Sequence, residues 1–230
     1  DMTTTPSRPL QPGDPAPSFV LPAVNREGTV GLENYRGKSP VFVGLFRGLH
    51  CPFCRRQVAQ LGLTREKLTG EGVETLAIVN TQEARARQYF QYRPTRVLLA
   101  ADPDVRTHQA FGLPRIGFVA DDTSPSEIQW PQRTTMAIFL ATQLNPKGVL
   151  PEPMNVPSAM EFMNKQEGFQ PTEVDQQIAA VHGTQLTGFF LIDRDGTIRW
   201  SYVEAPNRPD ELSNFPGDDE ILGAARALAG

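Results

Sequence analysis

The chain has 230 residues, of which 39% are hydrophobic and 21% are charged, an ordinary balance for a soluble globular protein. The formal net charge of −4 gives no reason to expect a nucleic-acid partner. No apolar run approaches the roughly 20 residues that span a bilayer, so we expect no membrane-spanning segment. The N-terminal stretch lacks a basic start followed by an apolar core, which predicts no signal peptide and a cytoplasmic location.

The first half of the chain alternates strands and helices. Residues 1–17 are rich in Pro, Thr and Ser, which is typical of a flexible arm. Short edge strands are expected at 18–23 and 28–35. Three strand–helix units follow, with strands at 40–46, 73–80 and 96–102 and helices at 51–72, 81–93 and 103–112. The continuous apolar run "PVFVGLF" at 40–46 indicates a strand buried on both faces, as in a parallel sheet. Asn80 or Thr81 is expected to cap the second helix.

Residues 115–187 interrupt this alternation, and we expect them to form an insertion with helical pieces at 157–166 and 171–182. The segment is rich in proline and holds four of the five methionines. Met and Phe side chains in such a segment most often form part of a hydrophobic core or of a dimer contact. A lid over the cysteine site or an apolar substrate pocket is the alternative.

The remaining chain predicts a hairpin over 188–204, with Asp195-Gly196 in its turn, and a final amphipathic helix over 218–230. The order of elements predicts an α/β fold in which helices cover a parallel sheet and an antiparallel hairpin is added at one side. We expect one domain with a core of 18–114 and 188–230.

The stretch "FRGLHCPFCRR" contains both cysteines of the chain, Cys51 and Cys54. A strand–Cys-x-x-Cys–helix arrangement places Cys51 at a helix N-terminus, where free backbone N–H groups and the helix dipole stabilise a thiolate. Pro52 suits the first helical turn. A thiolate can attack a peroxide oxygen or a disulfide sulfur, and Cys54, one turn later, can then attack the oxidised Cys51.

The charged neighbours of the cysteine pair are expected to tune the acidity of its thiols. Arg47, Arg55 and Arg56 bring positive charge, and His50 adds more when it is protonated. A metal site is disfavoured, because the pair supplies two ligands where tetrahedral zinc needs four. Inert, buried thiols remain an alternative.

A family resemblance becomes specific at this point. The chain contains several short motifs in order: "GDPAP" with "F-x-L", then "RG", the C-P-x-C pair and "ID-x-DG". With these motifs, the sequence resembles the peroxiredoxin-like branch of the AhpC/TSA (redoxin) family over about 12–114 and 188–230. The resemblance implies a thioredoxin-like fold with a central mixed sheet, flanking helices and a large insertion before the C-terminal hairpin. It implies Cys51 as the attacking cysteine and Cys54 as the resolving one. It also implies no cofactor, a peroxide or disulfide substrate, an external thiol reductant and a homodimer.

Three positions differ from the usual peroxiredoxin pattern. Gly44 and Gly48 stand where P-x-x-x-T-x-x-C has Pro and Thr, and Thr187 stands where an arginine precedes the hairpin strand. We therefore predict a peroxiredoxin-like thiol oxidoreductase in which nearby arginines replace these groups. The alternatives are a thiol–disulfide or substrate reductase that uses the same pair, and a non-catalytic binding module.

Overall fold

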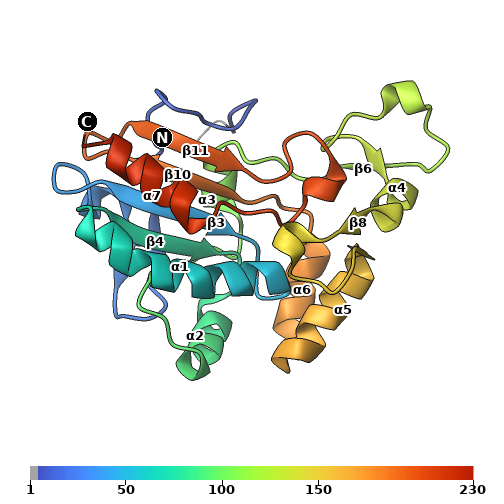
Figure 1. Cartoon of the computed structure of the whole chain (residues 1–230), viewed down its shortest axis with the longest axis horizontal. Coiled ribbons are helices and arrows are strands. Elements are labelled where there is room, and N and C mark those ends of the chain that lie inside the picture. Colours follow the sequence, from blue (N-terminus) through green and yellow to red (C-terminus); the bar gives the residue numbers. More distant parts are fainter. Residues whose placement is uncertain (1–4, 230) are drawn as a thin grey trace.

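The computed structural model describes residues 5–229 and is built around a five-stranded sheet (Figure 1). The strand order is β11-β10-β3-β4-β5, with β3, β4 and β5 parallel and β10 antiparallel to both of its neighbours. The strands are β3 (Val41–Phe46), β4 (Glu74–Val79), β5 (Leu98–Ala101), β10 (Gly188–Ile192) and β11 (Ile198–Val203). The predicted α/β fold with a mixed central sheet is confirmed, and so is the antiparallel hairpin at one side.

Side chains of the central strand β3 alternate between two cores. Phe42 and Phe46 lie in the core beneath α1 (Pro52–Gly70), α2 (Glu83–Tyr92) and α7 (Asp218–Ala227). Val43 and Leu45 point to the opposite core. That second core is closed by β1 (Val20–Pro22), β2 (Thr29–Gly31), the 3-10 helix η1 (Leu32–Asn34) and the chain that follows α3 (Arg106–Ala110). Burial on both faces explains the continuous apolar sequence of β3.

The described part of the N-terminal segment is attached to the sheet. The Leu10 N–H donates to the carbonyl of Phe111, and the Gly13 N–H donates to the carbonyl of Ile198. These bonds differ from the flexible arm expected over residues 1–17, because the segment pairs its backbone with the hairpin and with the chain after α3. The first four residues lie outside the described part.

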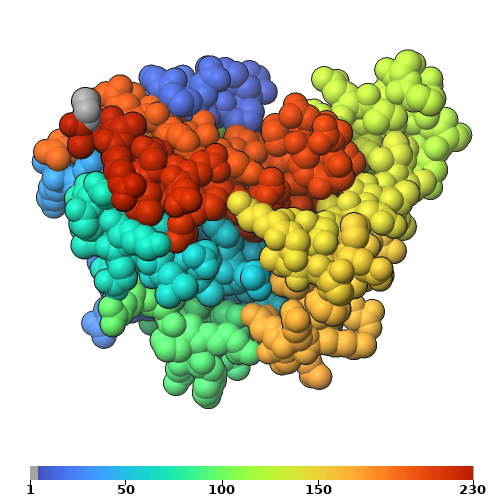
Figure 2. Space-filling model, in the orientation of Figure 1, coloured from blue at the N-terminus to red at the C-terminus, as the bar shows by residue number. Residues whose placement is uncertain are grey.

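Residues 115–187 lie at the end of the sheet where β3 runs into α1 (Figure 1). Their elements are β6 (Phe118–Val119), η2 (Pro125–Glu127), β7 (Thr134–Thr135), α4 (Met136–Ala141), β8 (Gln143–Leu144), η3 (Pro146–Gly148), β9 (Met154–Asn155), α5 (Val156–Glu167) and α6 (Glu173–His182). The two expected helical pieces correspond to α5 and α6. Figure 2 shows this segment packed against α1 and against the chain after β11, which includes η4 (Pro209–Glu211).

The cap of α2 differs from the prediction. Its N-cap is Gln82, and neither Asn80 nor Thr81 takes this position. The Thr81 hydroxyl instead accepts a hydrogen bond from the Leu49 N–H, and the Asn80 amide donates to the Asp102 carbonyl. Both polar side chains therefore fasten the loops at the ends of β3 and β5.

None of the helices described over residues 5–229 combines the length and the apolar character that a membrane span requires. The cytoplasmic location stays a prediction.

Candidate active site

The two cysteines lie at the junction of β3 and α1. Cys51 is the N-cap residue of α1, in extended conformation (φ −92°, ψ 105°), and Pro52 occupies the first turn. The Cys51 Sγ accepts a hydrogen bond from the backbone N–H of Cys54 at 3.2 Å. Both cysteines are free thiols and are buried, with 4% and 2% of their surfaces exposed. The local sequence thus places a sulfur atom where the helix offers an unpaired donor.

The two thiols differ in acidity. Burial alone would raise the pKa of Cys51, but hydrogen bonding from Cys54 and the positive charge of Arg47 lower it to about 6. Burial raises the pKa of Cys54 well above its usual value, and the neighbouring Cys51 adds to this. Cys51 therefore carries the thiolate, and Cys54 stays protonated. This division suits one attacking and one resolving sulfur.

The positive charge beside Cys51 comes from a buried ion pair. Arg47 meets the Glu204 carboxylate with both terminal nitrogens, one of them at 2.9 Å from Oε2. Glu204 is fully buried and also accepts from the backbone N–H groups of Thr187 at 3.0 Å and Ser213 at 2.6 Å. Burial would raise the pKa of Glu204, yet Arg47 and these donors hold it below its usual value. Sequence reasoning missed Glu204, which directly follows the last strand.

His50 does not supply positive charge. Burial, and then the charge of Arg47, lower its pKa to about 4, so the ring is neutral at neutral pH. The sequence analysis expected His50 to add positive charge when protonated, and with this pKa the ring is protonated only well below neutral pH. Both ring nitrogens lack a hydrogen-bond partner among residues 5–229, although 8% of the residue is exposed.

Arg55 donates its hydrogen bonds to groups other than the sulfur atoms. Its guanidinium donates to the Leu49 carbonyl, to Asn164 at 2.7 Å and to Glu167 at 2.7 Å. It also lies 3.6 Å from the ring centroid of Phe169. Arg55 therefore joins α1 to α5 and to the chain after it.

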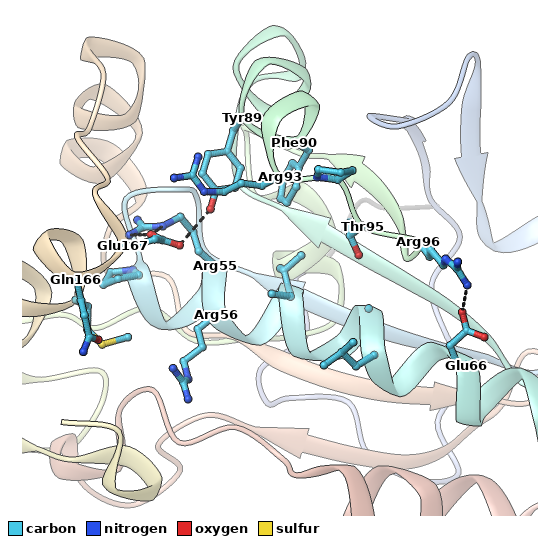
Figure 3. Close-up of a pocket in the computed structure, with 17 residues that line it drawn as sticks. Arg55, Arg56, Glu66, Tyr89, Phe90, Arg93, Thr95, Arg96, Gln166 and Glu167 are labelled. Carbon is cyan, nitrogen blue, oxygen red and sulfur yellow. Dashed lines mark hydrogen bonds and ion pairs between the residues drawn. The ribbon is translucent and has the colours of Figure 1, made fainter. Parts of the chain in front are cut away.

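A hollow of about 790 Å³ lies along α1, between α2 and α5 (Figure 3). Arg55 and Tyr89 converge on Glu167 on one side, and Arg96 pairs with Glu66 on the other. The exposed Arg56 also lines this hollow, whereas neither cysteine does. Over residues 5–229, no group of three or more His, Cys, Asp and Glu side chains is placed to hold a metal ion.

The two unusual glycines of the sequence have steric explanations. A side chain at Gly48 would place its Cβ 2.4 Å from the Asn80 carbonyl oxygen. At Gly44 it would lie 2.7 Å from the Phe46 ring. The hydroxyl of Thr187 has no hydrogen-bond partner in the described residues. Thr187 contacts the site through its backbone N–H and Glu204.

A cavity of about 280 Å³ opens beside Cys51. Its walls come from three parts of the chain: the β3–α1 junction, residues 115–187 and the loop after β11. They comprise Arg47, His50, Cys51, Pro52, Phe53, Ile116, Phe139, Leu144, Val156, Pro157, Met160, Gly183, Leu212 and Ser213. Most of these residues are apolar, so the sulfur faces a largely apolar chamber.

The sequence profile of the AhpC/TSA family matches residues 12–139, which is more than half of the chain. The chain belongs to the AhpC/TSA family. The match extends beyond residue 114, into the segment 115–187 that the expected resemblance did not include. A search of curated proteins gave no match.

Solved structures of two peroxiredoxins and a peroxidoxin share the fold. The reduced 2-Cys peroxiredoxin of Plasmodium vivax superposes with a TM-score of 0.58 at 16% identity, covering 96% of this chain and 83% of that one. The peroxidoxin BcpB of Mycobacterium tuberculosis gives 0.55 at 13% identity, covering 95% and 98%. The mitochondrial 2-Cys peroxiredoxin of Plasmodium falciparum gives 0.53 at 12%, covering 94% and 93%. Family and fold together make the chain a peroxiredoxin-like oxidoreductase with a thioredoxin-like fold.

Proposed function

We propose that the protein is a thiol-dependent peroxidase acting through Cys51 and Cys54. The observation that carries this proposal is the Cys51 thiol at the α1 N-cap, with its pKa lowered to about 6, on the wall of a cavity. At neutral pH such a thiol is mostly thiolate, whereas a free cysteine with a pKa of about 8.5 is mostly protonated.

The chemistry runs in three balanced steps. The Cys51 thiolate attacks the terminal oxygen of a peroxide, the O–O bond breaks, and the leaving oxygen takes up the proton that Cys51 released. The resulting sulfenic acid reacts with the Cys54 thiol to give a disulfide and one water. Two external thiols then reduce the disulfide and become a disulfide themselves.

The test is peroxide consumption by the reduced protein, with mass spectrometry of the product. Wild type should lose two thiols per chain and form a Cys51–Cys54 disulfide. Cys54→Ser should stop at a sulfenic acid that dimedone traps on Cys51. Cys51→Ser should consume no peroxide beyond the uncatalysed rate, and equal activity of this variant would end the proposal.

A thiol–disulfide reductase is the second candidate. The motivating observation concerns two positions of the usual peroxiredoxin pattern. Gly48 lacks the hydroxyl that is usual at its position, and Thr187 lacks the guanidinium that is usual at its position. This alternative expects fast attack of Cys51 on a small disulfide such as hydroxyethyl disulfide, and slow oxidation by peroxides. Comparing the two rate constants in one stopped-flow series separates the candidates. Unreactive thiols in both series would favour the binding module instead.

The external thiol reductant and the homodimer belong to the same proposal. The peroxidase rate with a small dithiol, compared with the rate with a protein reductant, shows which kind of external thiol reduces the disulfide. Sedimentation of the reduced and oxidised chain measures the second.

A further inference from the structure

The hollow along α1 is a second cavity, separate from the one beside Cys51. Its volume of about 790 Å³ falls in the range of small-molecule sites. Figure 3 shows Arg96 and Glu66 at one end of it. Arg55 and Glu167 lie at the other end, and the rise of an α-helix separates positions 55 and 66 by about 17 Å. A cavity of this length suits an elongated ligand.

The hollow is apolar between these two charged ends. Ala59, Gly62 and Leu63 lie on its α1 side, on one face of the helix because they are three or four residues apart. Leu63 is exposed, whereas Phe90 and Met163 on the other walls are buried. Apolar side chains that face water in such a hollow favour a ligand that covers them with apolar surface of its own.

The hollow is also rich in positive charge, although the chain as a whole has a net charge of −4. Arg96 lines both the hollow and a neighbouring pocket of about 380 Å³. Together the two cavities are lined by six arginines and three glutamates. The six arginines are Arg26, Arg55, Arg56, Arg65, Arg93 and Arg96. Because the positive charges outnumber the negative ones, this concave surface attracts anions.

Two of these arginines already share one carboxylate oxygen. The Nη1 atoms of Arg96 and Arg65 lie 2.6 Å and 4.0 Å from Oε1 of Glu66. This arrangement suits an oxyanion, because the planar fork of a guanidinium matches the oxygens of a carboxylate or a phosphate. The side chains of Arg96 and Glu66 are 79% and 55% exposed, so their ion pair contributes little to stability and opens at little cost.

We propose that the hollow binds an anionic amphiphile, whose carboxylate or phosphate replaces Glu66 between Arg65 and Arg96 and whose apolar body lies along α1. Arg56 and Arg93 line the same hollow and form no ion pair among residues 5–229, so their charge adds to the attraction for the anion. The site is independent of the proposed peroxidase, since neither cysteine lines the hollow.

Four probes test the class of ligand by isothermal titration of the reduced protein. Decanoate and decyl phosphate, used below the concentrations at which they form micelles, carry both the charge and the apolar body. Decanol lacks the charge, and inorganic phosphate lacks the apolar body. At least one of the two amphiphiles should bind at one site per chain, with a Kd at least about tenfold below those of decanol and phosphate. The tighter of the two identifies the oxyanion. No saturable binding of either amphiphile, or equal binding of decanol, would overturn the proposal.

Three substitutions test where the amphiphile binds. Arg96→Gln should weaken binding about tenfold, because a hydrogen bond between charged groups is lost. Leu63→Asp places a charge in the apolar part of the hollow, at an exposed position that tolerates a polar side chain, and should also weaken binding about tenfold. Glu66→Gln removes the competing carboxylate and should tighten binding about two- to fivefold, which a damaged fold would not do.

Two variants outside the hollow are the matched controls. Arg87→Gln corresponds to Arg96→Gln, because Arg87 also forms an exposed ion pair, with Glu83, but does not line the hollow. Val181→Asp corresponds to Leu63→Asp, because Val181 is exposed on α6. Both controls should bind the amphiphile as wild type does. Unchanged binding in Arg96→Gln and Leu63→Asp would overturn the proposal, and the peroxide assay tests the proposed function separately.

Discussion

Arg47 and Glu204 are 157 residues apart in the sequence, and they meet in the interior as a two-point ion pair beside the cysteines. The pair joins the end of β3 to the chain directly after β11. Arg47 lowers the pKa of Cys51, and Glu204 opposes this effect. The acidity of the proposed nucleophile therefore depends on a contact between two distant parts of the chain.

Removing the charge of Glu204 should destabilise the fold. Glu204→Gln leaves the buried Arg47 guanidinium without its counter-charge, and the free energy of unfolding should fall by about 3–5 kcal/mol. Denaturant unfolding measures this fall. Asp195→Asn, which breaks the exposed pair with Arg199, is the control and should change stability little. The double variant Arg47→Met, Glu204→Leu should recover much of the loss, since neither charge is then left alone. An equal effect of Glu204→Gln and Asp195→Asn would contradict the prediction.

The reactivity of Cys51 should follow the lowered pKa. The thiolate fraction rises with pH through the pKa, so alkylation by iodoacetamide should reach half its maximal rate near pH 6 and level off above neutrality. Cys54→Ser isolates Cys51 for this measurement and keeps the backbone N–H that bonds to Sγ.

Two arginine variants test the cause of that pKa. Arg47→Gln removes a positive charge that lowers the pKa of Cys51, so the alkylation midpoint should move to higher pH. Arg56→Gln, on the exposed side of α1, should leave it unchanged. A midpoint that stays near pH 6 in Arg47→Gln would exclude Arg47 as the source of the shift.

Arg55 should matter for stability rather than for thiol acidity. Arg55→Gln removes charged hydrogen bonds to α5 and should lower the free energy of unfolding by about 1–3 kcal/mol. Amide exchange in α5 should become faster, because Arg55 is one of the ties between α5 and α1. The alkylation midpoint of Cys51 should not move. A clear upward shift would contradict this prediction and would support the expectation from the sequence that the charge of Arg55 tunes the cysteine pair.

These contacts show where sequence reasoning succeeded. The apolar run at 40–46, the Cys-x-x-Cys helix start and the Asp195-Gly196 turn are local patterns, and each predicted its element correctly. Strand, Cys-x-x-Cys motif and helix follow one another directly over residues 41–70, and this local order marks the two cysteines as the candidate site.

Glu204 could not be found in this way, because its partner Arg47 is distant in the sequence and nothing local marks an acid after a strand as buried. The protonation state of His50 depends on burial, which the sequence does not display. Residues 115–187 contribute apolar side chains to the cavity beside Cys51. The sequence analysis named an apolar pocket only as one alternative, because helical spacing alone does not say which cavity a Met or Phe side chain faces.

Restoring the peroxiredoxin threonine should harm this protein. Gly48→Thr would drive a Cβ to 2.4 Å from the Asn80 carbonyl oxygen and crowd the His50 ring at 3.1 Å. Because the obstacle is backbone, the fold must shift, and the free energy of unfolding should fall by about 1–3 kcal/mol. Gly223→Ala in α7 is the matched control, since a Cβ there meets no atom within 4 Å, and it should raise stability by about 0.5–1 kcal/mol. Thermal unfolding and the peroxide rate are measured on both variants. A Gly48→Thr protein that is as stable as wild type and faster with hydrogen peroxide would show that the site accepts the usual hydroxyl after all.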